Sequence, residues 1–464
     1  MLKIDLAPGG TIVEQVVSGI AGLIDTRQLP SGRKLPSIRE FAAANGISKS
    51  TVVEAFDRLV AQGLLTSRQK VGFFVAGRRP GLDLTAGAPA AERDIDPIWA
   101  LRNTLLPGPG LLRPGCGWLP EDWLNGAGLR RALRALARSP HARLTDYGQP
   151  LGYAPLRAQL QLVFAARGIE APPNRIILTD SAMQAIDLVG RLLVQPGDKI
   201  FVDDPGYYNF LANLRVHRAQ VIGVPFRQDG PDIEVFASLA AQHRPVLYIT
   251  NSTLHNPTGA TLAPAVAHRL LKIAEAHDIA ILEDDIYADF EEHPAPRLAA
   301  MDQLNRVIYT GSFSKTLSAA CRCGWIAARQ DWIEGLADLR MATIFSNNEL
   351  SAQLLHRLLT DGSYRKHVDG LRTRLRAASV RVHGQLEACG LSRWIEPRGG
   401  MFLWAMLPED CDSAEIARLG LASGIALLPG NVFSVSRSAA RFLRFNAAQS
   451  DNKRIYDFLK GALR

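Results

Sequence analysis

Residues 307–325, VIYTGSFSKTLSAACRCGW, are the stretch that decides the fold. The apolar run at 307–309 predicts a short buried strand. A small, hydroxyl-rich loop follows, then Lys315, and Arg322 comes seven residues later. A nearby cation and partial desolvation both favour the neutral form of a lysine, and a neutral amine forms an imine with an aldehyde. The hydroxyls and Arg322 suit a bound phosphate.

The same loop has two other interpretations. A single lysine among glycine and serine is also typical of a solvated loop residue. A phosphate-binding P-loop needs glycine immediately before its lysine, and Ser314 stands there instead, so that motif is excluded. The order Ser-x-Ser-Lys-Thr with arginine at plus seven resembles the pyridoxal-phosphate lysine loop of fold-type I aminotransferases. The rest of the chain tests this resemblance.

Size and composition indicate a soluble protein. The 464 residues suffice for two or three domains, and 47% apolar with 21% charged residues is ordinary for globular proteins. No apolar run is long enough to span a membrane, and the start, MLKIDLAPGG, lacks the apolar region of a secretory signal. We therefore expect a cytoplasmic protein.

The cysteines favour reduced thiols. There are five, widely scattered, which argues against a disulfide framework. Cys321-x-Cys323 has the form of half a metal site, but no second Cys/His pair accompanies it. Packing residues are the preferred interpretation, and no metal is predicted.

The positive charge is concentrated near the N-terminus. Residues 1–80 hold 11 Lys and Arg against 6 Asp and Glu, an excess of 5 out of a net charge of +8. Such a basic module is the electrostatic footprint of a nucleic-acid-binding domain.

The first eighty residues predict three helices and a hairpin. An apolar stripe runs through residues 11–24, and Ser37 with Glu40 forms a capping box for a second helix that ends at Gly46. Ser48 caps a third helix that ends before Gly63, so the last two helices make a helix-turn-helix. Residues 64–67 and 73–75 predict a two-stranded wing. A dimerisation or capping module would show the same periodicity.

Two observations favour DNA binding. The third helix begins Ser48-Lys49-Ser50-Thr51, small donors and a cation where a recognition helix meets the groove. Basic residues surround it as candidates for phosphate contacts. The full set of candidates is Arg33, Lys34, Arg39, Ser48, Lys49, Ser50, Thr51, Arg68 and Lys70.

The same segment resembles the winged helix of the GntR regulator family over about 65 residues. The resemblance rests on Leu35-Pro36-Ser37-x-Arg39, Ser48, Thr51-Val52, Leu59 and Gly63. It implies that Arg39, Lys49, Ser50 and Thr51 touch DNA. Lys70 departs from the family, which often has glycine at this position in the wing.

Beyond a basic, Gly/Pro-punctuated linker, strands and helices alternate. We place a winged-helix domain at 1–77, a linker at 78–95 and a larger domain at 96–464, with a small α+β subdomain at about 345–464. Seven apolar runs predict a mostly parallel seven-stranded sheet covered on both faces, an α/β fold. These runs are 175–178, 199–202, 221–224, 246–249, 279–282, 307–309 and 325–327. Ligands bind at the carboxyl ends of such strands.

Residues with site chemistry follow these strands. Ser181 opens a helix whose free amides suit a phosphate, and Tyr207 offers a ring for stacking on a flat cofactor. Asp284 follows another strand, where a carboxylate can hold a pyridine nitrogen protonated. Singly, each is also compatible with a turn, a capped helix or a solvated acid.

Together these motifs resemble the class I/II aminotransferases from about residue 85 to 464, in the family's order. The resemblance implies that Lys315 binds pyridoxal 5'-phosphate covalently, Asp284 pairs with the ring nitrogen, and Arg444 binds a substrate carboxylate. It assigns other cofactor contacts to Asn256 and Tyr287 at the ring hydroxyl, to Tyr207 on the ring face, and to Ser181, Ala182, Met183, Ser312, Ser314 and Arg322 at the phosphate, with Tyr147 reaching the partner subunit's phosphate.

Three positions depart from the aminotransferase pattern. Asp180 and Met183 replace small or polar residues beside the phosphate, and Asp180 adds a negative charge there. Residues 318–320 lack a proline that often follows the lysine.

A GntR-like winged helix joined to an aminotransferase-like domain is the layout of the MocR regulators. The resemblance implies a homodimeric transcription factor that binds operator DNA and senses an amino compound, or pyridoxal phosphate itself, through aldimine chemistry. An active amino acid:2-oxo acid aminotransferase with an attached DNA-binding domain is the alternative, because no residue needed for transamination is missing. A third hypothesis is a plain enzyme whose N-terminal module only mediates assembly.

Overall fold

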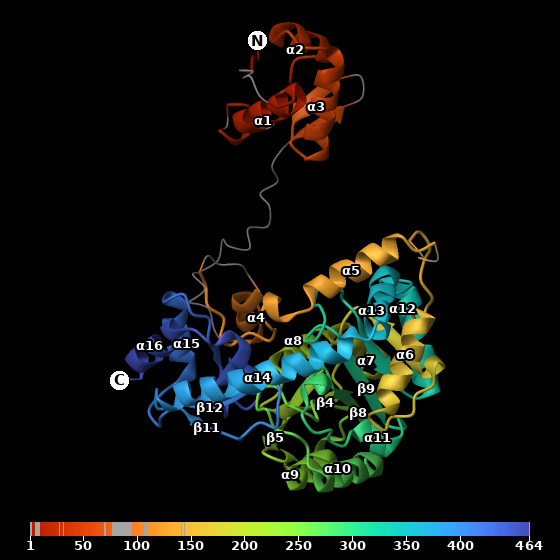
Figure 1. Ribbon diagram of the computed structural model, residues 1–464, viewed down its shortest axis with the longest axis vertical. Helices are drawn as coiled ribbons and strands as arrows, with labels where there is room; N and C mark the ends of the chain where they lie inside the picture. The colour runs from red at the N-terminus through yellow and green to blue at the C-terminus, as the bar shows by residue number, and fades with distance from the viewer. Residues whose placement is uncertain are drawn as a thin grey trace. The chain divides into compact units, whose positions relative to one another are not determined.

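The structure is a computed structural model that describes residues 2–4, 10–26, 28–30, 32–68, 71–76, 95–105, 110–140, 142 and 144–463. The chain forms two compact units, residues 1–88 and 89–464 (Figure 1). The predicted linker at 78–95 lies outside the described residues, apart from Ile95.

The first unit has the three predicted helices. α1 (Ile12–Asp25) and α2 (Ile38–Asn45) both begin with a capping box, formed by Thr11 with Glu14 and by Ser37 with Glu40. Gly46 ends α2 with a φ of 65°, a left-handed conformation that glycine adopts without steric cost. α3 (Lys49–Ala61) starts at Ser48, whose hydroxyl accepts from the amide of Thr51.

The wing packs on these helices through aromatic rings. β1 (Leu65–Arg68) pairs antiparallel with β2 (Gly72–Val75). Phe56 on α3 lies 5.3 Å from the ring of Phe41 and 5.0 Å from the ring of Phe73, both edge-on. Burying a phenylalanine side chain contributes about 1.5–3 kcal/mol, so these contacts fix the wing against the helix-turn-helix.

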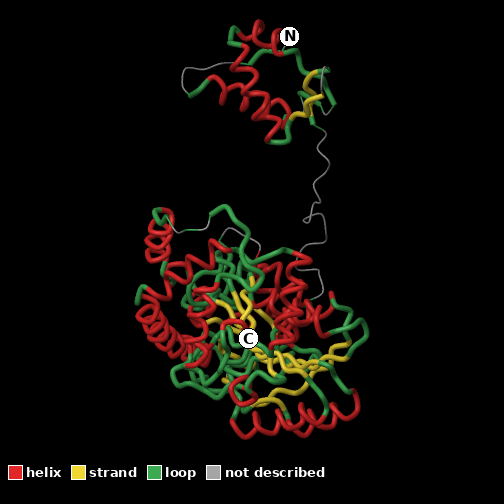
Figure 2. The backbone as a smooth tube through the Cα atoms, turned by 90° about the vertical axis from the view of Figure 1, so that its right-hand side faces the viewer, coloured by secondary structure: helices red, strands yellow, loops and turns green. Residues whose placement is uncertain are grey.

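A mixed sheet of eight strands lies at the centre of the second unit, in the order β3-β10-β9-β8-β7-β4-β5-β6, with helices on either side (Figure 2). Its strands are β3 (Ile176–Thr179), β4 (Lys199–Asp204), β5 (Gln220–Arg227), β6 (Gly230–Pro231), β7 (Leu247–Thr250), β8 (Ala280–Asp284), β9 (Val307–Ser312) and β10 (Gly324–Ala327). Seven correspond to the predicted runs. The prediction of seven was one strand short, because β6 has only two residues and no apolar run marks it.

The neighbouring strands β9, β8, β7, β4 and β5 pair in parallel. In contrast, β10 pairs antiparallel with both β9 and β3, and β6 pairs antiparallel with β5. Side chains alternate strictly between two cores on the two faces of the sheet. Tyr309, Tyr248 and Ile281 enter one core, and their neighbours Ile308, Ile249 and Leu282 enter the other. This alternation explains why the strands appear in the sequence as continuous apolar runs.

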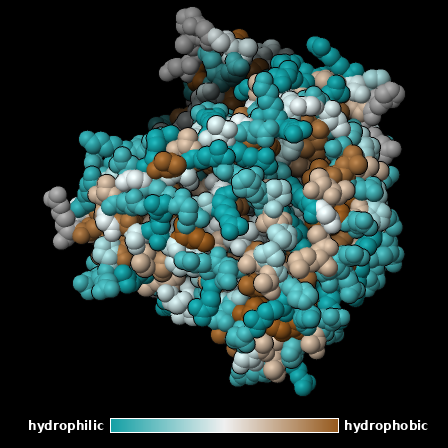
Figure 3. Space-filling model, turned by 60° about the horizontal axis from the view of Figure 1, so that its bottom comes forward, coloured by the Kyte–Doolittle hydropathy of each residue, from teal (hydrophilic) through white to brown (hydrophobic). Residues whose placement is uncertain are grey.

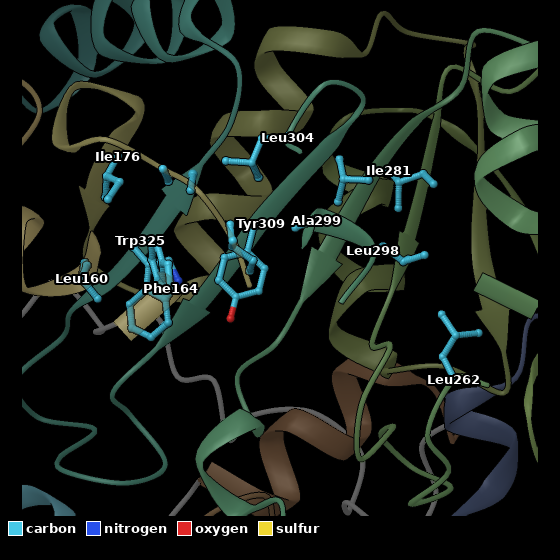
Figure 4. Packing of buried hydrophobic residues seen from close by; sticks show 14 of the residues in the cluster. Leu160, Phe164, Ile176, Leu262, Ile281, Leu298, Ala299, Leu304, Tyr309 and Trp325 are labelled. Atoms are coloured by element: carbon cyan, nitrogen blue, oxygen red, sulfur yellow. The ribbon is translucent and has the colours of Figure 1, made fainter. Parts of the chain in front are cut away.

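Helices cover both faces. The face that carries Tyr309 packs against α6 (Ala154–Ala165), α9 (Ile233–His243), α10 (Pro264–Ala276), α11 (Leu298–Asp302) and α13 (Glu349–Thr360). In this core Phe164 of α6 lies 5.3 Å from Tyr309 and 5.9 Å from Trp325, ring to ring (Figure 4). The other face packs against α7 (Ala182–Leu193), α8 (Tyr208–Val216) and α12 (Gln330–Thr343), while α5 (Gly126–Ala137) packs on α13.

A second core surrounds a four-stranded antiparallel sheet. Its strands are β11 (Ser392–Arg393), β12 (Phe402–Met406), β13 (Leu428–Pro429) and β14 (Phe442–Asn446). The rings of Trp404 and Phe442 stack at 5.1 Å on it. The helices α14 (Ser363–Glu387), α15 (Ser413–Ala422) and α16 (Lys453–Ala462) pack here, and α4 (Pro97–Leu105) adds Trp99.

Hydrophobic side chains on the face shown in Figure 3 are scattered among hydrophilic ones. This mixture is normal for a protein surface in water. None of the helices in the described part of the chain is both long and apolar enough to cross a membrane.

Candidate functional site

The predicted site residues gather at one edge of the large sheet. The parallel strands β8 and β9 end there at Asp284 and Ser312. Because β10 runs antiparallel, it begins at the same edge, where Gly324 pairs with Ser312 on one side and with Thr179 on the other. The turn after β3, the lysine loop after β9 and the acid after β8 therefore share one edge.

Lys315 lies in the loop after β9, and its Nζ donates to the carbonyl oxygen of Gly117 at 2.5 Å. A Cβ at Gly117 would lie 3.7 Å from that nitrogen and 3.9 Å from Nη2 of Arg444, so the backbone of Gly117 lies close to both cations. Burial, followed by the positive charge of Arg444, lowers the pKa of Lys315 to about 8. A substantial fraction of the amine is thus neutral near pH 8.

Asp284 is the last residue of β8 and is buried. Its Oδ1 is fully enclosed and has no hydrogen-bond partner among the described residues. Burial raises the pKa of Asp284 to about 7. A buried carboxylate oxygen without a partner is costly, and a positively charged N–H donor placed against it would relieve that cost.

Asn256 joins two other predicted residues. Its Nδ2 donates to the hydroxyl of Tyr287 at 3.3 Å, and its Oδ1 accepts from Nη1 of Arg444 at 2.6 Å. The preceding residue, His255, is fully buried between Asp203 and Thr258, at 3.2 and 2.8 Å. These contacts hold the Asn256 loop over the end of the sheet.

Arg444 is buried on β14, and Nη2 donates to the carbonyl oxygen of Gly115 at 2.6 Å. Its guanidinium lies over the rings of Phe402 and Phe433, 4.3 and 4.8 Å from their centroids. Within the described residues Nε has no partner and no carboxylate forms an ion pair with the side chain. A buried, unpaired guanidinium favours binding of a ligand carboxylate.

Tyr207 is the residue immediately before α8. Its ring packs edge-on against Tyr208 and Phe210, at 5.1 and 5.2 Å, and burial raises its pKa. The charge of Asp284 also raises the pKa of Tyr207, so the phenol lies near that carboxylate. Its predicted stacking on a cofactor ring stays a prediction.

Three of the predicted phosphate residues, Ser181, Ser312 and Ser314, already form hydrogen bonds within the protein. Ser181 caps α7, and its hydroxyl accepts from the amide of Gln184 at 3.0 Å. The hydroxyl of Ser312 contacts that of Ser314 at 2.8 Å and donates to the carbonyl of Cys323 at 2.8 Å. The Ala182 and Met183 amides begin α7 and have no intrahelical acceptor. Arg322 is exposed, with a φ of 42°.

The negative charge of Asp180 is bound within the protein. One carboxylate oxygen accepts from Nε2 of Gln184 at 3.3 Å, and the other from the amide of Asn348 at 3.3 Å. Arg340 lies fully buried nearby, and the charge of Asp180 raises its pKa against the stronger effect of burial, which lowers it to about 10. These contacts offset the extra charge beside the predicted phosphate site.

The candidate DNA contacts lie on one small surface of the first unit. Arg33, Lys34 and Arg39 are exposed, as are Ser48, Lys49 and Ser50 at the start of α3, while Thr51 is half-buried. None of the four basic residues in this set forms an ion pair with another described residue. The backbone of Arg68 ends β1, whereas Lys70 lies outside the described residues.

Comparison with known proteins decides the assignment. Residues 122–460 match the aminotransferase class I and II family, and residues 12–75 match the bacterial regulatory proteins of the gntR family. The first match covers well over half of the chain. The chain belongs to the aminotransferase class I and II family. Its helix-turn-helix is of the GntR type, so the two domains have the MocR-type organisation expected from the sequence.

Two curated relatives share nearly the whole length of this aminotransferase-family chain. The uncharacterised HTH-type transcriptional regulator YdfD of Bacillus subtilis is 27% identical over 461 residues, which cover 96% of this chain and 94% of the relative. The probable rhizopine catabolism regulatory protein MocR of Rhizobium meliloti is 27% identical, with 92% and 88% covered.

Among solved structures, kynurenine aminotransferase of Pyrococcus horikoshii has a TM-score of 0.73 and 25% identity. It covers 81% of this chain and 95% of its own, and it was solved with PMP.

The residues of this family member fit pyridoxal phosphate. Asp284 Oδ1 has no partner among the described residues and could accept from a pyridinium N–H, and Lys315 is an amine of lowered pKa. Asn256 and Tyr287 lie together and could contact a ring hydroxyl, and the first amides of α7, which have no intrahelical acceptor, could bind a phosphate.

Sequence reasoning missed several residues that build the site. Gly115 and Gly117 act through backbone carbonyls, which leave no side-chain signature. The Gly-Cys-Gly spacing was the available signal for a close backbone approach. Tyr364 reaches the lysine loop from α14, and no local pattern marks it.

Proposed function

We propose that this chain is a transcriptional regulator that binds DNA through its winged helix and responds to an amino compound, or to pyridoxal phosphate, bound at Lys315. One observation carries the proposal: a buried carboxylate oxygen of Asp284, without a partner among the described residues, lies in the same site as an amine of lowered pKa, in a chain that also has a winged helix. When bound, pyridoxal phosphate supplies an aldehyde that exchanges amines and a ring that withdraws electrons.

The chain's own residues account for recognition. Lys315 would hold the cofactor through its amine, of which about half is neutral and nucleophilic at pH 8. Asp284 would hold the ring nitrogen of the cofactor, through a carboxylate oxygen that has no partner among the described residues. Arg444 binds the carboxylate of an amino acid ligand, and the buried rings around it exclude water from that contact.

DNA binding tests the first half of the proposal. Binding of the region upstream of the chain's own gene is measured with and without a panel of amino acids and amines. We expect at least one amine to change the affinity for DNA. An amine shifts the equilibrium only as far as its affinities for two states of the protein differ. A chain that binds DNA identically with every amine, while turning amines over, contradicts the sensor and supports the enzyme.

Lys49→Ala assigns the DNA contact to α3. Loss of one phosphate contact lowers the slope of log affinity against log salt by about 0.9. Lys453→Ala makes the same charge change on the exposed start of α16 and serves as the control. We expect only the first substitution to change the slope, and equal slopes would remove Lys49 from the DNA interface.

An active aminotransferase is the second candidate, favoured by the presence of Lys315, Asp284, Asn256, Tyr287 and Arg444 in one site. Its signature is release of a keto acid with conversion of the cofactor to the pyridoxamine form. Repeated turnover with a second keto acid would establish the enzyme, whereas a spectral change without keto acid favours the sensor.

We further infer a homodimer. Tyr147 has 83% of its side chain exposed and contacts Phe345, itself 64% exposed, at 5.6 Å between rings. Two large apolar side chains that lie together in solvent are typical of an interface. Light scattering of the wild type and of Tyr147→Ser with Phe345→Ser tests this: we expect a dimer that the double substitution weakens, and a wild-type monomer contradicts the inference.

A further inference from the structure

The residue after Lys315 is tied to a helix that lies outside the sheet. Thr316 is buried, and its hydroxyl lies 2.9 Å from the hydroxyl of Tyr364. Its carbonyl oxygen accepts from Nε2 of His367 at 2.8 Å. Both partners lie in the first two turns of α14. Two side chains of α14 therefore hold the lysine loop by hydrogen bonds, one at the hydroxyl and one at the carbonyl oxygen of Thr316.

The hydrogen-bond donors in this network can be assigned. Tyr364 donates its only hydroxyl proton to Oδ2 of Asp289, because an ionised carboxylate only accepts. Thr316 must then donate to the oxygen of Tyr364. His367 must carry its proton on Nε2, because the carbonyl of Thr316 cannot donate. Removing the hydroxyl of Thr316 therefore breaks the bond to Tyr364, and removing the hydroxyl of Tyr364 breaks that bond and the one to Asp289.

Asp289 is itself fixed to the turn that follows α6 and to α14. Its Oδ1 accepts from Nη2 of Arg167 at 2.7 Å, and its carbonyl accepts from Nε of Arg372 at 2.8 Å. Asp289 lies only two residues beyond Tyr287, which faces Asn256. The anchor of Tyr364 is thus continuous with the chain segment that forms the cofactor site.

α14 continues from this anchor into the small sheet. Leu371 and Leu375 pack in a buried cluster with Tyr287 and Phe402, and Val382 lies further along in the core of the four-stranded sheet. Figure 1 shows α14 running from the helices around the large sheet toward β12. A single helix therefore connects the lysine loop to the part of the chain that carries Arg444.

We propose that Thr316 and Tyr364 are positioning residues that hold Lys315 against Gly117 and link the occupancy of Lys315 to the N-terminal turns of α14. The proposal rests on the proposed role of Lys315 in binding a cofactor aldehyde. With the bond intact, the lysine loop is fixed while Nζ donates to Gly117. When another amine displaces the lysine, the loop relaxes and the bond between Thr316 and Tyr364 loosens.

The first test uses the full chain without cofactor. Acetic anhydride labels accessible amines, and mass spectrometry gives the labelling rate of Lys315. We expect Thr316→Val and Tyr364→Phe each to raise this rate about three- to tenfold, the effect of one net hydrogen bond. The double variant should exceed the larger single effect only slightly, because both substitutions remove the same bond.

The matched control is Tyr456→Phe. It removes another buried tyrosine hydroxyl, which donates to the carbonyl of Ser450 at 2.7 Å in the small subdomain. We expect it to leave the labelling of Lys315 unchanged. Rates in the Thr316 and Tyr364 variants equal to that of this control would overturn the proposal, as would fully additive effects in the double variant.

The second test uses protein loaded with pyridoxal phosphate and methylamine as the probe, since methylamine has no carboxylate for Arg444. Amide hydrogen exchange is measured over residues 363–372. We expect methylamine to raise exchange there in the wild type. In Thr316→Val, exchange over these residues should be high without methylamine and should not rise when it is added. If methylamine changes exchange in none of the proteins, the link between Lys315 and α14 is contradicted.

The two tests separate this inference from the function on which it rests. A wild type that takes up no pyridoxal phosphate contradicts the proposed function, yet the labelling test still measures whether Tyr364 and Thr316 position Lys315. If the wild type takes up pyridoxal phosphate and responds to methylamine, and both variants respond as the wild type does, only the inference about α14 is overturned.

Discussion

The two ends of the site differ in how far their polar side chains are hydrogen-bonded. At the Asp284 end two buried polar atoms lack partners among the described residues, whereas at the Ser312 end the serine hydroxyls already have partners in the protein. Asp284 Oδ1 and Arg444 Nε are buried and unsatisfied among the described residues. In contrast, the hydroxyls of Ser181 and Ser312 satisfy an amide and a carbonyl of the protein. A ligand gains most where it relieves an existing cost, so the first end should dominate affinity. We name these the open end and the satisfied end.

The largest effect is expected for Arg444→Met at the open end. The substitution keeps an apolar stem among the aromatic rings and removes the buried charge. Loss of such a charge contact costs about 2–5 kcal/mol, so affinity for amino acids should fall roughly 30- to 5000-fold. Affinity for amines without a carboxylate should change little. Absorption titration with L-alanine and with methylamine measures both, and equal losses for the two ligands would remove Arg444 from the carboxylate site.

The reactivity of Lys315 gives the next effect. Its pKa is lowered from 10.5 to about 8 by burial and by Arg444, so the neutral fraction rises through pH 8 instead of pH 10.5. Near neutral pH the neutral fraction of the amine should be roughly 300-fold larger than that of a free lysine. Labelling of cofactor-free protein across pH 6–11 tests this, and Arg444→Met should move the midpoint upward. A midpoint near 10.5 in the wild type contradicts the assigned environment.

Asp284→Asn should weaken binding of pyridoxal phosphate about 10- to 100-fold, because a charge-assisted hydrogen bond is worth roughly 1.5–3 kcal/mol. Asparagine keeps the shape and removes the negative charge, so the loss reports the bond to the ring nitrogen. Equilibrium dialysis measures the affinity. An unchanged dissociation constant would show that the open carboxylate does not face the ring.

The smallest effect is expected at the satisfied end. Ser312→Ala removes a hydroxyl that is already bonded to Cys323 and Ser314, so affinity for pyridoxal phosphate should fall only about two- to tenfold. Pyridoxal without phosphate should bind equally to the wild type and the variant. A loss larger than that of Asp284→Asn would reverse the comparison between the two ends.

Much of the fold and part of the candidate site were predictable from the sequence. The seven longer strands appeared as apolar runs, because both faces of the large sheet are covered and the middle of each strand is apolar. The capping boxes at Ser37 and the start of α3 at Ser48 followed from local rules that depend on few residues. Lys315, Asp284 and Asn256 stood at strand ends, and the structure brings them to one edge.

Other features could not be predicted, because they depend on long-range contacts. The contact of Lys315 with the Gly117 carbonyl joins residues 198 positions apart, and Tyr364 meets Thr316 across 48. The hydrogen bond that Asp180 accepts from the amide of Asn348 joins residues 168 positions apart, and Arg340 comes near Asp180 only in the fold. The sequence does not distinguish the open end from the satisfied end, because the identity of a residue, serine or aspartate, does not reveal whether its polar atoms have partners in the fold.

The central claim is that Lys315 is the residue that carries the cofactor aldehyde. Protein incubated with pyridoxal phosphate is reduced with borohydride, digested and mapped by mass spectrometry. We predict one modified peptide, with the phosphopyridoxyl mass on Lys315. An unmodified Lys315, with the label absent or on another lysine, would contradict the claim.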